Sequence, residues 1–430
     1  MSKSVSVHTL GCRVNMYESC AIAEMLQERG FKVSKNKQCD YYIVNTCAVT
    51  AESERKSRQL VRRCSTKGKV LVIGCASQID SGYKDIENVI YIGGNRNKTA
   101  VVECIEQHIK NEFSTVHSVI PMDNAPYEEM SLSGESDVFS ECRAFIKIQD
   151  GCNGKCTYCI IPKCRGSVRS REAESIISEA KRLVTNGYKE IILTGIEVGA
   201  YNKVPLGDLV SMVSKTNGLY RLRLGSLSPN IISERFLSKV SDLDNFMPHI
   251  HLSLQSCSDK ILTAMKRPYR KKDIYERVSL IRDYIPDCQI SADIIVGFPG
   301  ENEDDFNETV SALKELDIFH VHSFPYSERE GTPAAEMINS VPKSVRSQRN
   351  GILIKECQDI KNKILDSKIN KKLKVLVEKV NDGVAIGHTE EFLEVKIIGD
   401  EFSVGEIVEV KAVSHDEGSL NCELIGRLAK

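Results

Sequence analysis

The chain has 430 residues, of which 41% are hydrophobic and 27% charged, and its formal net charge is −1. This composition is typical of a soluble protein of two or three domains, and it excludes a global field that attracts nucleic acid. No apolar run approaches the roughly 18 residues of a membrane span, and the N-terminus lacks the apolar core of a signal peptide. We therefore expect a cytosolic protein without a membrane partner, in which sixteen cysteines indicate metal or redox chemistry rather than disulfides.

Residues 1–117 alternate strand-like and helix-like patterns, as expected for a parallel sheet with helices on its faces. Amphipathic helices are expected at 16–30 and 52–64. The apolar segments expected as strands are 4–10, 41–47, 69–75 and 89–94. This order predicts a flavodoxin-like N-terminal domain over residues 1–117, followed by a polar linker at 118–137.

The alternation resumes over residues 138–366, where strand-like segments are separated by mostly helical stretches. Six strands are expected, at 143–149, 189–195, 220–226, 248–254, 289–297 and 319–324. They predict a partial (β/α)6 barrel with its active groups on the loops after the strand C-terminal ends. A basic helical connector at 341–374 leads to short strands, which predict an all-β, OB-like barrel over residues 367–430. The fold class is thus α/β and multidomain.

Three cysteines with the spacing C-x3-C-x2-C follow the first strand of the second domain: Cys152, Cys156 and Cys159. Three thiolates on one short loop can bind three corners of a four-iron cluster and leave its fourth iron open to a substrate or cofactor. A structural zinc site normally has four ligands, and Cys164 could be the fourth. Structural zinc, or cysteines without a special role, therefore stays open as an alternative.

A second set of cysteines, Cys12, Cys47 and Cys75, is widely separated in the sequence, but each follows the end of an expected parallel strand. The C-terminal ends of parallel strands share one edge of a sheet, and ligands collect there. The sequence therefore predicts that the fold brings these three thiols together in a shared metal site. The alternative is three small buried residues, since free cysteines are commonly buried.

The stretch "GCNGKCTYC" (151–159) resembles the signature of the radical S-adenosylmethionine (SAM) enzymes, and its continuation "CTYCIIPKCRGSVRSR" resembles that of the methylthiotransferases. The contexts "TLGCRVNMYES", "NTCAVT" and "IGCASQ" match the same family. The resemblance implies two [4Fe–4S] clusters. Cys152, Cys156 and Cys159 would hold the cluster that binds SAM, and an auxiliary cluster would lie on the other three cysteines. Cys164 has no ligand role in this pattern.

Polar or glycine-containing loops follow the expected barrel strands, as a SAM pocket requires. The resemblance implies that Glu197 lies where related enzymes hold the methionine amino group. The candidate SAM-binding residues are Gly195, Glu197, Ser226, Gln255 and Asp293. Each could alternatively be a turn or cap residue, and no residue is identified as catalytic.

The family has three branches, which act on isopentenyladenosine in tRNA, on threonylcarbamoyladenosine in tRNA, or on an aspartate of a ribosomal protein. The stretches "HTLGCRVNMYES", "KSRQLVRR", "SLQSCSDKILTAMKRPY" and "HSFPYSEREGTPAA" resemble the threonylcarbamoyladenosine branch. The resemblance implies that one SAM methylates a sulfur on the auxiliary cluster. A second SAM yields a radical that removes the hydrogen from carbon 2 of the adenine, where the methylthio group is inserted. The partners would be a tRNA anticodon loop and a low-potential electron donor, such as flavodoxin or ferredoxin, and a monomer is expected.

Three basic segments, 55–69, 266–272 and 341–374, favour contact with RNA phosphates. The C-terminal module resembles a TRAM domain, which grips tRNA in this family. Residues 370–430, however, hold eight Lys or Arg and twelve Asp or Glu. Either one basic face binds tRNA, or the other segments provide most of the affinity.

Two alternatives from other classes remain: a radical enzyme whose first domain binds RNA without metal, and a zinc-binding RNA-interaction protein without catalysis.

Overall fold

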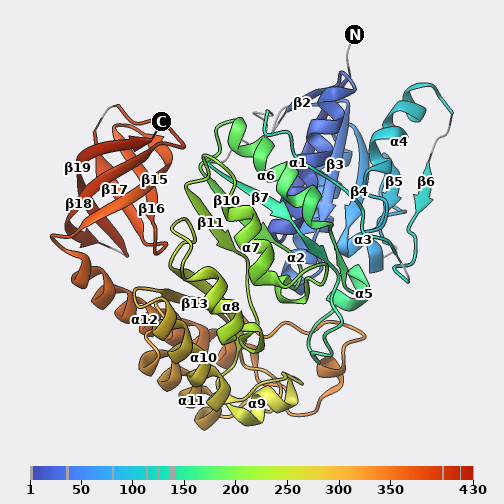
Figure 1. The fold of residues 1–430 in the computed structure, drawn as a ribbon. Helices are drawn as coiled ribbons and strands as arrows, with labels where there is room; N and C mark the ends of the chain where they lie inside the picture. The colour runs from blue at the N-terminus through green and yellow to red at the C-terminus, as the bar shows by residue number, and fades with distance from the viewer. Residues whose placement is uncertain are drawn as a thin grey trace.

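The protein is described by a computed structural model that covers residues 3–34, 38–79, 82–112, 115–123, 125–135, 142–399, 401–416 and 418–429. Three units follow one another along the chain (Figure 1). The N-terminal α/β unit and the C-terminal barrel lie on opposite sides of the central unit.

The N-terminal unit is a parallel sheet with strand order β2-β1-β3-β4-β5-β6. Its strands are β1 (Ser4–Thr9), β2 (Lys32–Ser34), β3 (Tyr41–Thr46), β4 (Lys69–Gly74), β5 (Val89–Gly93) and β6 (Val116–Ser118). Its helices are α1 (Arg13–Glu28), α2 (Ala51–Ser65), α3 (Cys75–Ile79) and α4 (Ala100–Ile109). The order of the first five strands is that of a flavodoxin-like fold, which confirms the predicted class. The short strands β2 and β6 were not predicted.

Alternating side chains on the central strands build two cores, one on each face of this sheet. Ile43 and Leu71 pack with residues of α1 and α4 on one face. Val44 and Val72 pack with residues of α2 and α3 on the other. Because both faces are covered, every residue of β3 is buried, as in other parallel sheets.

The predicted linker is irregular but packed where the structure describes it. Met122 and Met130 are buried. The Tyr17 hydroxyl of α1 donates to the Met130 carbonyl at 2.7 Å, and the Leu132 amide donates to Glu179 of the second unit at 2.8 Å. The linker therefore joins the two units by contacts on both. Residues 124, 136 and 137 lie outside the described residues.

The second unit contains all six predicted strands, in two parallel sheets with orders β11-β10-β7 and β12-β13-β14. The strands are β7 (Arg143–Lys147), β10 (Glu190–Thr194), β11 (Arg221–Leu224), β12 (His249–Gln255), β13 (Gln289–Val296) and β14 (His320–Pro325). Isolated parallel bridges, Leu222–Phe246 and Leu227–Leu252, link the two sheets. This arrangement confirms the predicted partial barrel.

Helices cover the outside of this partial barrel. They are α6 (Ala173–Thr185), α7 (Leu206–Ser214), α8 (Glu234–Val240), α9 (Asp259–Ala264), α10 (Lys271–Tyr284) and α11 (Glu303–Glu315). Helix α5 (Ile161–Arg165) instead packs against α3, and its Cys164 lies in a core of the N-terminal unit. Short elements complete the unit: strands β8 (Gln149–Asp150) and β9 (Arg169–Ser170), and the 3-10 helices η1 (Val198–Ala200), η2 (Pro229–Ile231) and η3 (Pro333–Glu336).

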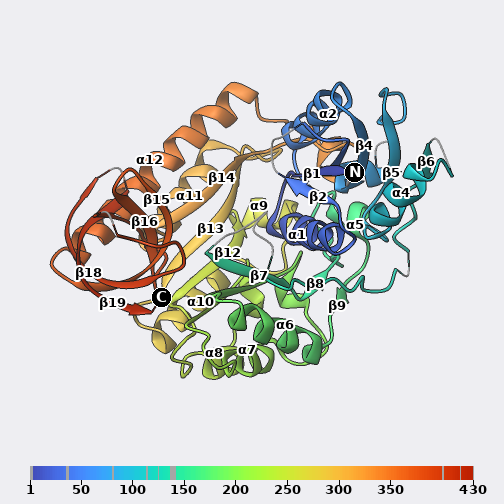
Figure 2. The ribbon, with the colours of Figure 1, turned by 90° about the horizontal axis from the view of Figure 1, so that it is seen from above.

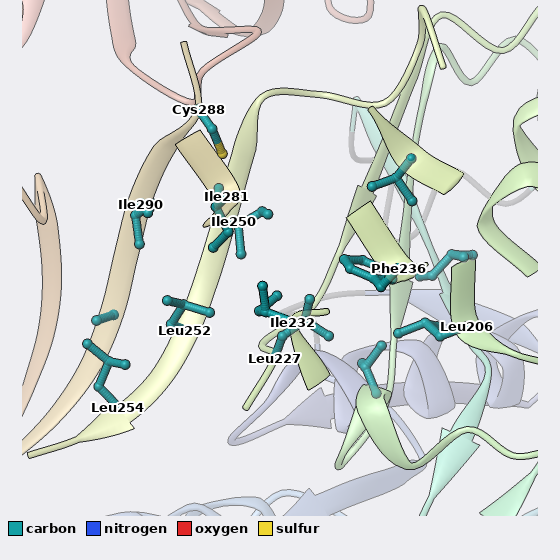
Figure 3. Close-up of a cluster of buried hydrophobic side chains, with 14 of the residues drawn as sticks. Leu206, Leu227, Ile232, Phe236, Ile250, Leu252, Leu254, Ile281, Cys288 and Ile290 are labelled. Atoms are coloured by element: carbon teal, nitrogen blue, oxygen red, sulfur yellow. The ribbon is translucent and has the colours of Figure 1, made fainter. Parts of the chain in front are cut away.

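Successive side chains of β12 point alternately into the hydrophobic core and to the opposite face of the sheet. Ile250, Leu252 and Leu254 are buried in the main hydrophobic cluster, beside Ile290 of β13 (Figure 3). His249 and His251 alternate with them and lie on the other face. One strand thus provides both core residues and polar residues for a site.

Helix α12 (Lys343–Lys368) is the predicted basic connector, and it runs along one side of the molecule (Figure 2). Three of its cations, Arg346, Arg349 and Lys368, are buried and pair with Glu328, Glu301 and Glu391. The expectation of RNA contact is therefore wrong for these three side chains.

The predicted OB-like barrel is present as a closed barrel with strand order β15-β16-β17-β19-β18. Its strands are β15 (Lys372–Asn381), β16 (Val384–Thr389), β17 (Glu394–Ile398), β18 (Ile407–Asp416) and β19 (Ser419–Ala429). Within the described ranges, we find no helix with the length and apolar character needed to cross a membrane.

Candidate active site

The loop after β8 brings Cys152, Cys156 and Cys159 together. The Gly154 amide donates to the Cys152 sulfur at 3.2 Å. A β-carbon on Gly154 would lie 3.1 Å from the Cys152 sulfur and 3.9 Å from the Cys156 sulfur, so a glycine lets the backbone pass close to both thiols. Burial, together with the charges of Cys156 and Cys152, raises the pKa of Cys159 to about 12.

Arg267 was not among the predicted site residues, yet it is bonded to this loop. Its Nη1 donates to the Cys156 sulfur at 3.2 Å, and its Nε donates to the Tyr269 hydroxyl at 2.7 Å. Tyr269 is only 2% exposed and donates to the Ser253 carbonyl. The expectation that segment 266–272 contacts RNA is therefore wrong for Arg267 and Tyr269, which pack beneath the cysteine loop.

The other cysteine trio lies at one edge of the N-terminal sheet. Cys12 is the N-cap of α1, Cys47 follows β3, and Cys75 follows β4 as the first residue of α3. Gly11 has a φ of +98°, and a β-carbon there would lie 2.7 Å from the Cys47 sulfur. The side-chain Nδ2 of Asn15 donates to the carbonyls of Leu10 and Thr46, which ties two of these loops together. The structure thus places the three thiols at the shared edge.

Arg165 links this trio to the other cysteine loop. It is 0% exposed, and its Nε donates to the Cys75 sulfur at 3.4 Å. Its Nη1 donates to Glu18 of α1 at 3.0 Å and to Asp150 at 2.8 Å. Asp150 in turn accepts from the amide of Gly151, directly before Cys152. One guanidinium therefore connects both cysteine sites.

The buried ion network around Arg165 carries more positive than negative charge. Glu18 also pairs with Lys98 and Lys147, and Lys147 pairs with Asp150 at 2.7 Å. With Arg169, whose guanidinium lies 3.5 Å from Asp150, four cations and two anions leave a net charge of +2, which anionic sulfurs beside Arg165 would offset. This surplus suits a thiolate cluster at Cys75.

Cys164 is fully buried and hydrogen-bonded to Cys75. This bond, together with Arg165, lowers the pKa of Cys75 to about 5 against the opposing effect of burial. The sequence pattern assigned no ligand role to Cys164, and the structure places it beside a predicted ligand. Its position in a short helix after Pro162 could not be related to Cys75 from sequence alone.

The spacing of the thiols allows a test of the zinc alternative. Zn–S bonds of about 2.3 Å at tetrahedral angles hold sulfurs about 3.8 Å apart. Among the residues that the structure describes, the one group of three candidate ligands with all ligand atoms within 4.8 Å is His251, Asp293 and His322. Neither cysteine trio has all three sulfurs within 4.8 Å of one another, so neither has the spacing of an assembled tetrahedral zinc site.

A cavity of about 450 Å³ lies where the three units meet. The N-terminal unit contributes Gly11–Val14, and the C-terminal barrel contributes Phe392. The second unit contributes residues along β10 to β14 and directly after β10 and β11: Ile192, Thr194, Gly195, Arg223, Leu224, Gly225, Ser226, His249, His251, Ser291, Asp293, His320, His322 and Phe324. The exposed surface of Cys12 faces this cavity, so a predicted cluster ligand lies in its wall.

The predicted SAM-pocket residues are only partly brought together. Gly195, Ser226 and Asp293 line the cavity, whereas Glu197 and Gln255 are not in its wall. A β-carbon on Gly195 would lie 2.9 Å from Oε1 of Gln149. That oxygen accepts from the Glu197 amide, and the charge of Glu197 acts on Cys152. Glu197 therefore lies on the side of the cysteine loop.

Sequence reasoning missed a cluster of imidazoles around Asp293. Nε2 of His251 lies 3.1 Å from Oδ2 of Asp293, and Nδ1 of His322 lies 3.3 Å from Oδ1. These two contacts hold the pKa of Asp293 well below its usual range, against the effect of burial. The alternation of His249 and His251 along β12 was the available sequence signal.

Comparison with known proteins identifies the family of this chain. The Radical SAM superfamily matches residues 146–313, and Uncharacterized protein family UPF0004 matches residues 4–93. The chain is 34% identical to "Threonylcarbamoyladenosine tRNA methylthiotransferase MtaB" of Bacillus subtilis (strain 168), over 95% of this chain and 93% of that protein. The chain belongs to the radical SAM methylthiotransferases.

The names of other members of this methylthiotransferase family give different substrates. A Thermotoga maritima protein that also bears the MtaB name is 34% identical over 98% of this chain and 97% of its own length. The "tRNA-2-methylthio-N(6)-dimethylallyladenosine synthase" of Alkaliphilus oremlandii is 34% identical over 99% of this chain and 93% of its own. Membership in the family excludes the alternative of a zinc-binding protein without catalysis.

A solved structure supports the fold of this radical SAM methylthiotransferase. The radical SAM methyltransferase TsrM from Kitasatospora setae, with cobalamin and a [4Fe-4S] cluster bound, superposes with a TM-score of 0.57 at 16% identity. The match covers 78% of this chain and 77% of that chain.

Proposed function

We propose that this enzyme converts N6-threonylcarbamoyladenosine, next to the tRNA anticodon, to its 2-methylthio derivative. The observation that supports this most directly is the cavity whose wall contains Cys12 of the first cysteine trio and residues of strands β10 to β14 of the radical SAM unit. A substrate bound there lies beside Cys12 and beside Gly195, which directly follows β10. The names of full-length relatives from Bacillus subtilis and Thermotoga maritima support the choice of substrate.

Membership in the radical SAM superfamily implies SAM and one [4Fe–4S] cluster, and we assign Cys152, Cys156 and Cys159 as its ligands. A second cluster on Cys12, Cys47 and Cys75 is part of this proposal. When bound, these groups supply a carbon radical and the sulfur that replaces a hydrogen on the adenine. The chain's own contribution is to neutralise and orient both sites through Arg267 and Arg165, which donate to one sulfur of each trio.

The second candidate substrate is the dimethylallyl-substituted adenosine named for the Alkaliphilus relative. A dimethylallyl group is apolar, whereas a threonylcarbamoyl group carries a carboxylate, a hydroxyl and a urea. The cavity wall holds Arg13, Arg223, two serines and four histidines. Burying so many polar groups against an apolar substituent would leave donors unpaired, which favours the threonylcarbamoyl group.

The reaction requires a low-potential electron donor, flavodoxin-like or ferredoxin-like, because a cluster must be reduced before SAM is cleaved. One chain supplies every wall of the cavity, so we expect a monomer to suffice.

The first test combines product analysis with iron content. We expect the anaerobically reconstituted wild type to bind about eight irons per chain and the Cys12/Cys47/Cys75→Ala variant about four. Mass spectrometry of digested tRNA should show the 2-methylthio product with the wild type and none with the variant. Cys104→Ala is the matched control and should keep about eight irons, because Cys104 is a buried cysteine of the same unit in the core on the opposite face of the sheet from Cys75.

Equal iron in the wild type and the triple variant would contradict the auxiliary cluster and leave a radical enzyme with a metal-free first domain. A product formed on dimethylallyladenosine but not on threonylcarbamoyladenosine would replace the proposed substrate by the second candidate.

A further inference from the structure

Three polar side chains meet in the cavity wall on the neighbouring strands β12, β13 and β14, which lie side by side (Figure 2). They belong to His251, Asp293 and His322. Asp293 and His322 are direct partners in the register of β13 and β14, and His251 is the partner of Ser291 on the other side of β13. Because strands hold side chains more precisely than loops do, this group has a fixed geometry.

The spacing of this group is that of ligands on one metal ion. Nε2 of His251 lies 3.1 Å from Oδ2 of Asp293, and Nδ1 of His322 lies 3.3 Å from Oδ1. One ligand atom of each residue lies within 4.8 Å of the other two. Metal–ligand bonds of about 2.1 Å at angles of roughly 90° to 109° hold ligand atoms about 3.0–3.4 Å apart. The three side chains therefore need little movement to bind an ion.

The donor set indicates the class of ion. Two imidazoles and one carboxylate, with further positions left open, bind divalent first-row transition metals such as Zn²⁺ and Fe²⁺.

Ser291 orients the ring of His251 from the side away from Asp293. Its Oγ is buried and lies 2.7 Å from Nδ1 of His251 and 2.8 Å from Nε2 of His249. When Nδ1 of His251 donates to this oxygen and the serine hydroxyl donates to His249, Nε2 of His251 presents a free lone pair beside the carboxylate. Metal-bound histidines are held in this way, by a hydrogen bond from their other ring nitrogen. In the reverse proton arrangement, Nε2 of His251 donates to Asp293 without any movement of the heavy atoms.

We propose that His251, Asp293 and His322 bind one divalent transition-metal ion, and that the carboxylate of the threonylcarbamoyl group completes its coordination. The second part rests on the proposed function. Three protein ligands leave positions on the ion for a substrate, as in catalytic metal sites. One carboxylate and two neutral imidazoles leave the ion with a net charge of +1, which an anionic substituent would neutralise. This assignment replaces the expectation that Asp293 binds SAM.

The first test measures the binding of Mn²⁺ to the reconstituted full chain, from the decrease in the electron paramagnetic resonance signal of the free ion. Oxidised [4Fe–4S]²⁺ clusters are diamagnetic and add no signal, and Mn²⁺ prefers oxygen and imidazole ligands to thiols. After a wash with EDTA, the wild type should bind one Mn²⁺ per chain. Asp293→Asn and His322→Asn should each weaken this binding by at least about 10-fold.

His320→Asn is the matched control, because His320 lies on the same strand as His322 and lines the same cavity but is outside the ligand group. It should bind Mn²⁺ like the wild type. A wild type that binds no Mn²⁺ would overturn the proposal even if a variant did not fold, and the three side chains would then form a hydrogen-bonded group only. Equal binding by the wild type and both ligand variants would also overturn it, since the ion would then lie elsewhere.

The second test measures the affinity of the chain for two anticodon stem-loops, with and without Mn²⁺. One carries threonylcarbamoyladenosine and the other dimethylallyladenosine, so that binding of Mn²⁺ to RNA phosphates is common to both. The ion should tighten binding of the first by about 5- to 150-fold, the usual range of coupling between two ligands, and leave the second unchanged. An equal effect on both would overturn the contact with the carboxylate. The proposed function fails separately, if no 2-methylthio product forms from threonylcarbamoyladenosine.

Discussion

The residues that join the first two units are charged and fully buried. Glu18, Lys98, Lys147, Asp150 and Arg165 form one network with almost no exposed surface. Such a network gains little over apolar packing when it is complete, but it is strongly destabilising when one member is removed. The same residues hold a sulfur of one cysteine trio and the loop of the other, so stability and chemistry depend on the same side chains.

Replacing Arg165 by Met should lower the free energy of unfolding by about 3–5 kcal/mol, because Glu18 and Asp150 each lose a buried partner. Denaturant unfolding of the full chain, followed by far-UV circular dichroism, measures this change. Arg29→Met serves as the control and should have little effect, because its ion pair is exposed. Comparable stability of the two variants would mean that water or a rearranged lysine replaces the guanidinium.

At the scale of elements, both cysteine sites are built from glycine-containing loops at the C-terminal ends of parallel strands. Gly11 and Gly151 have positive φ values, and the space beside them is filled by the Cys47 side chain and by the backbone of Gly166 and Ser167, respectively. A side chain at Gly11 would collide with the Cys47 sulfur. The glycines thus set the distance between loops that come from different strands.

Gly11→Ala should prevent Cys12 and Cys47 from holding the same cluster, and iron content should fall from about eight to about four per chain. Gly30→Ala is a control for backbone strain alone. Gly30 also has a positive φ, +80°, and a β-carbon there would meet no atom of the described residues within 4 Å. That variant should keep its iron. Equal iron loss in both would assign the effect to strain rather than to contact with Cys47.

The main strands could be predicted because their apolar pattern follows directly from burial. The cysteine trio of the first unit was also predictable, since Cys12, Cys47 and Cys75 each follow a recognisable strand. Contacts between residues far apart in the sequence could not be predicted. No pattern around Arg165 or Arg267 indicates that their side chains contact Cys75 and Cys156. Basic segments were misread for the same reason, because Tyr269 and Arg346 look exposed until their neighbours are known.

At the scale of the whole molecule, the C-terminal barrel docks on the partial barrel through backbone acceptors, an ion pair between Arg143 and Glu378, and one aromatic ring. Arg221 donates to the carbonyls of His388 and Lys374. Phe392 stacks between His249 and His388, with ring centroids 4.9 and 4.5 Å away. The acidic barrel therefore contributes Phe392 to the cavity wall. This role does not require the barrel to have a tRNA-binding face.

This interface should make stability depend on pH. Burial and the charge of Arg143 lower the pKa of His388 to about 3, whereas an unfolded histidine titrates near about 6.5. Below about pH 6.5 the unfolded chain binds a proton that the folded chain does not, so the free energy of unfolding falls as the pH falls. Between pH 6.5 and 5 this group should remove about 2 kcal/mol.

Unfolding of the full chain in denaturant at pH 7.5 and 5.0, for the wild type and His388→Asn, measures this dependence. The variant should lose less stability on acidification than the wild type. His117→Asn, at an exposed position on β6, is the control and should behave like the wild type. If His388→Asn loses as much stability between pH 7.5 and 5.0 as the wild type, then Glu378, which lies 2.6 Å from His388, keeps the imidazole protonated in the folded protein.

The cavity wall takes its first contribution from residues 11–14 and its last from Phe392, near the two ends of the chain. During synthesis the N-terminal domains fold before the C-terminal barrel has left the ribosome. A nascent chain can therefore hold all six cysteines in place while its cavity still lacks a wall. A radical generated at that stage would meet water and bystander molecules. Because the β15–β19 barrel is translated after the other two units and completes the enclosure, a chain that lacks this barrel has no closed reaction chamber.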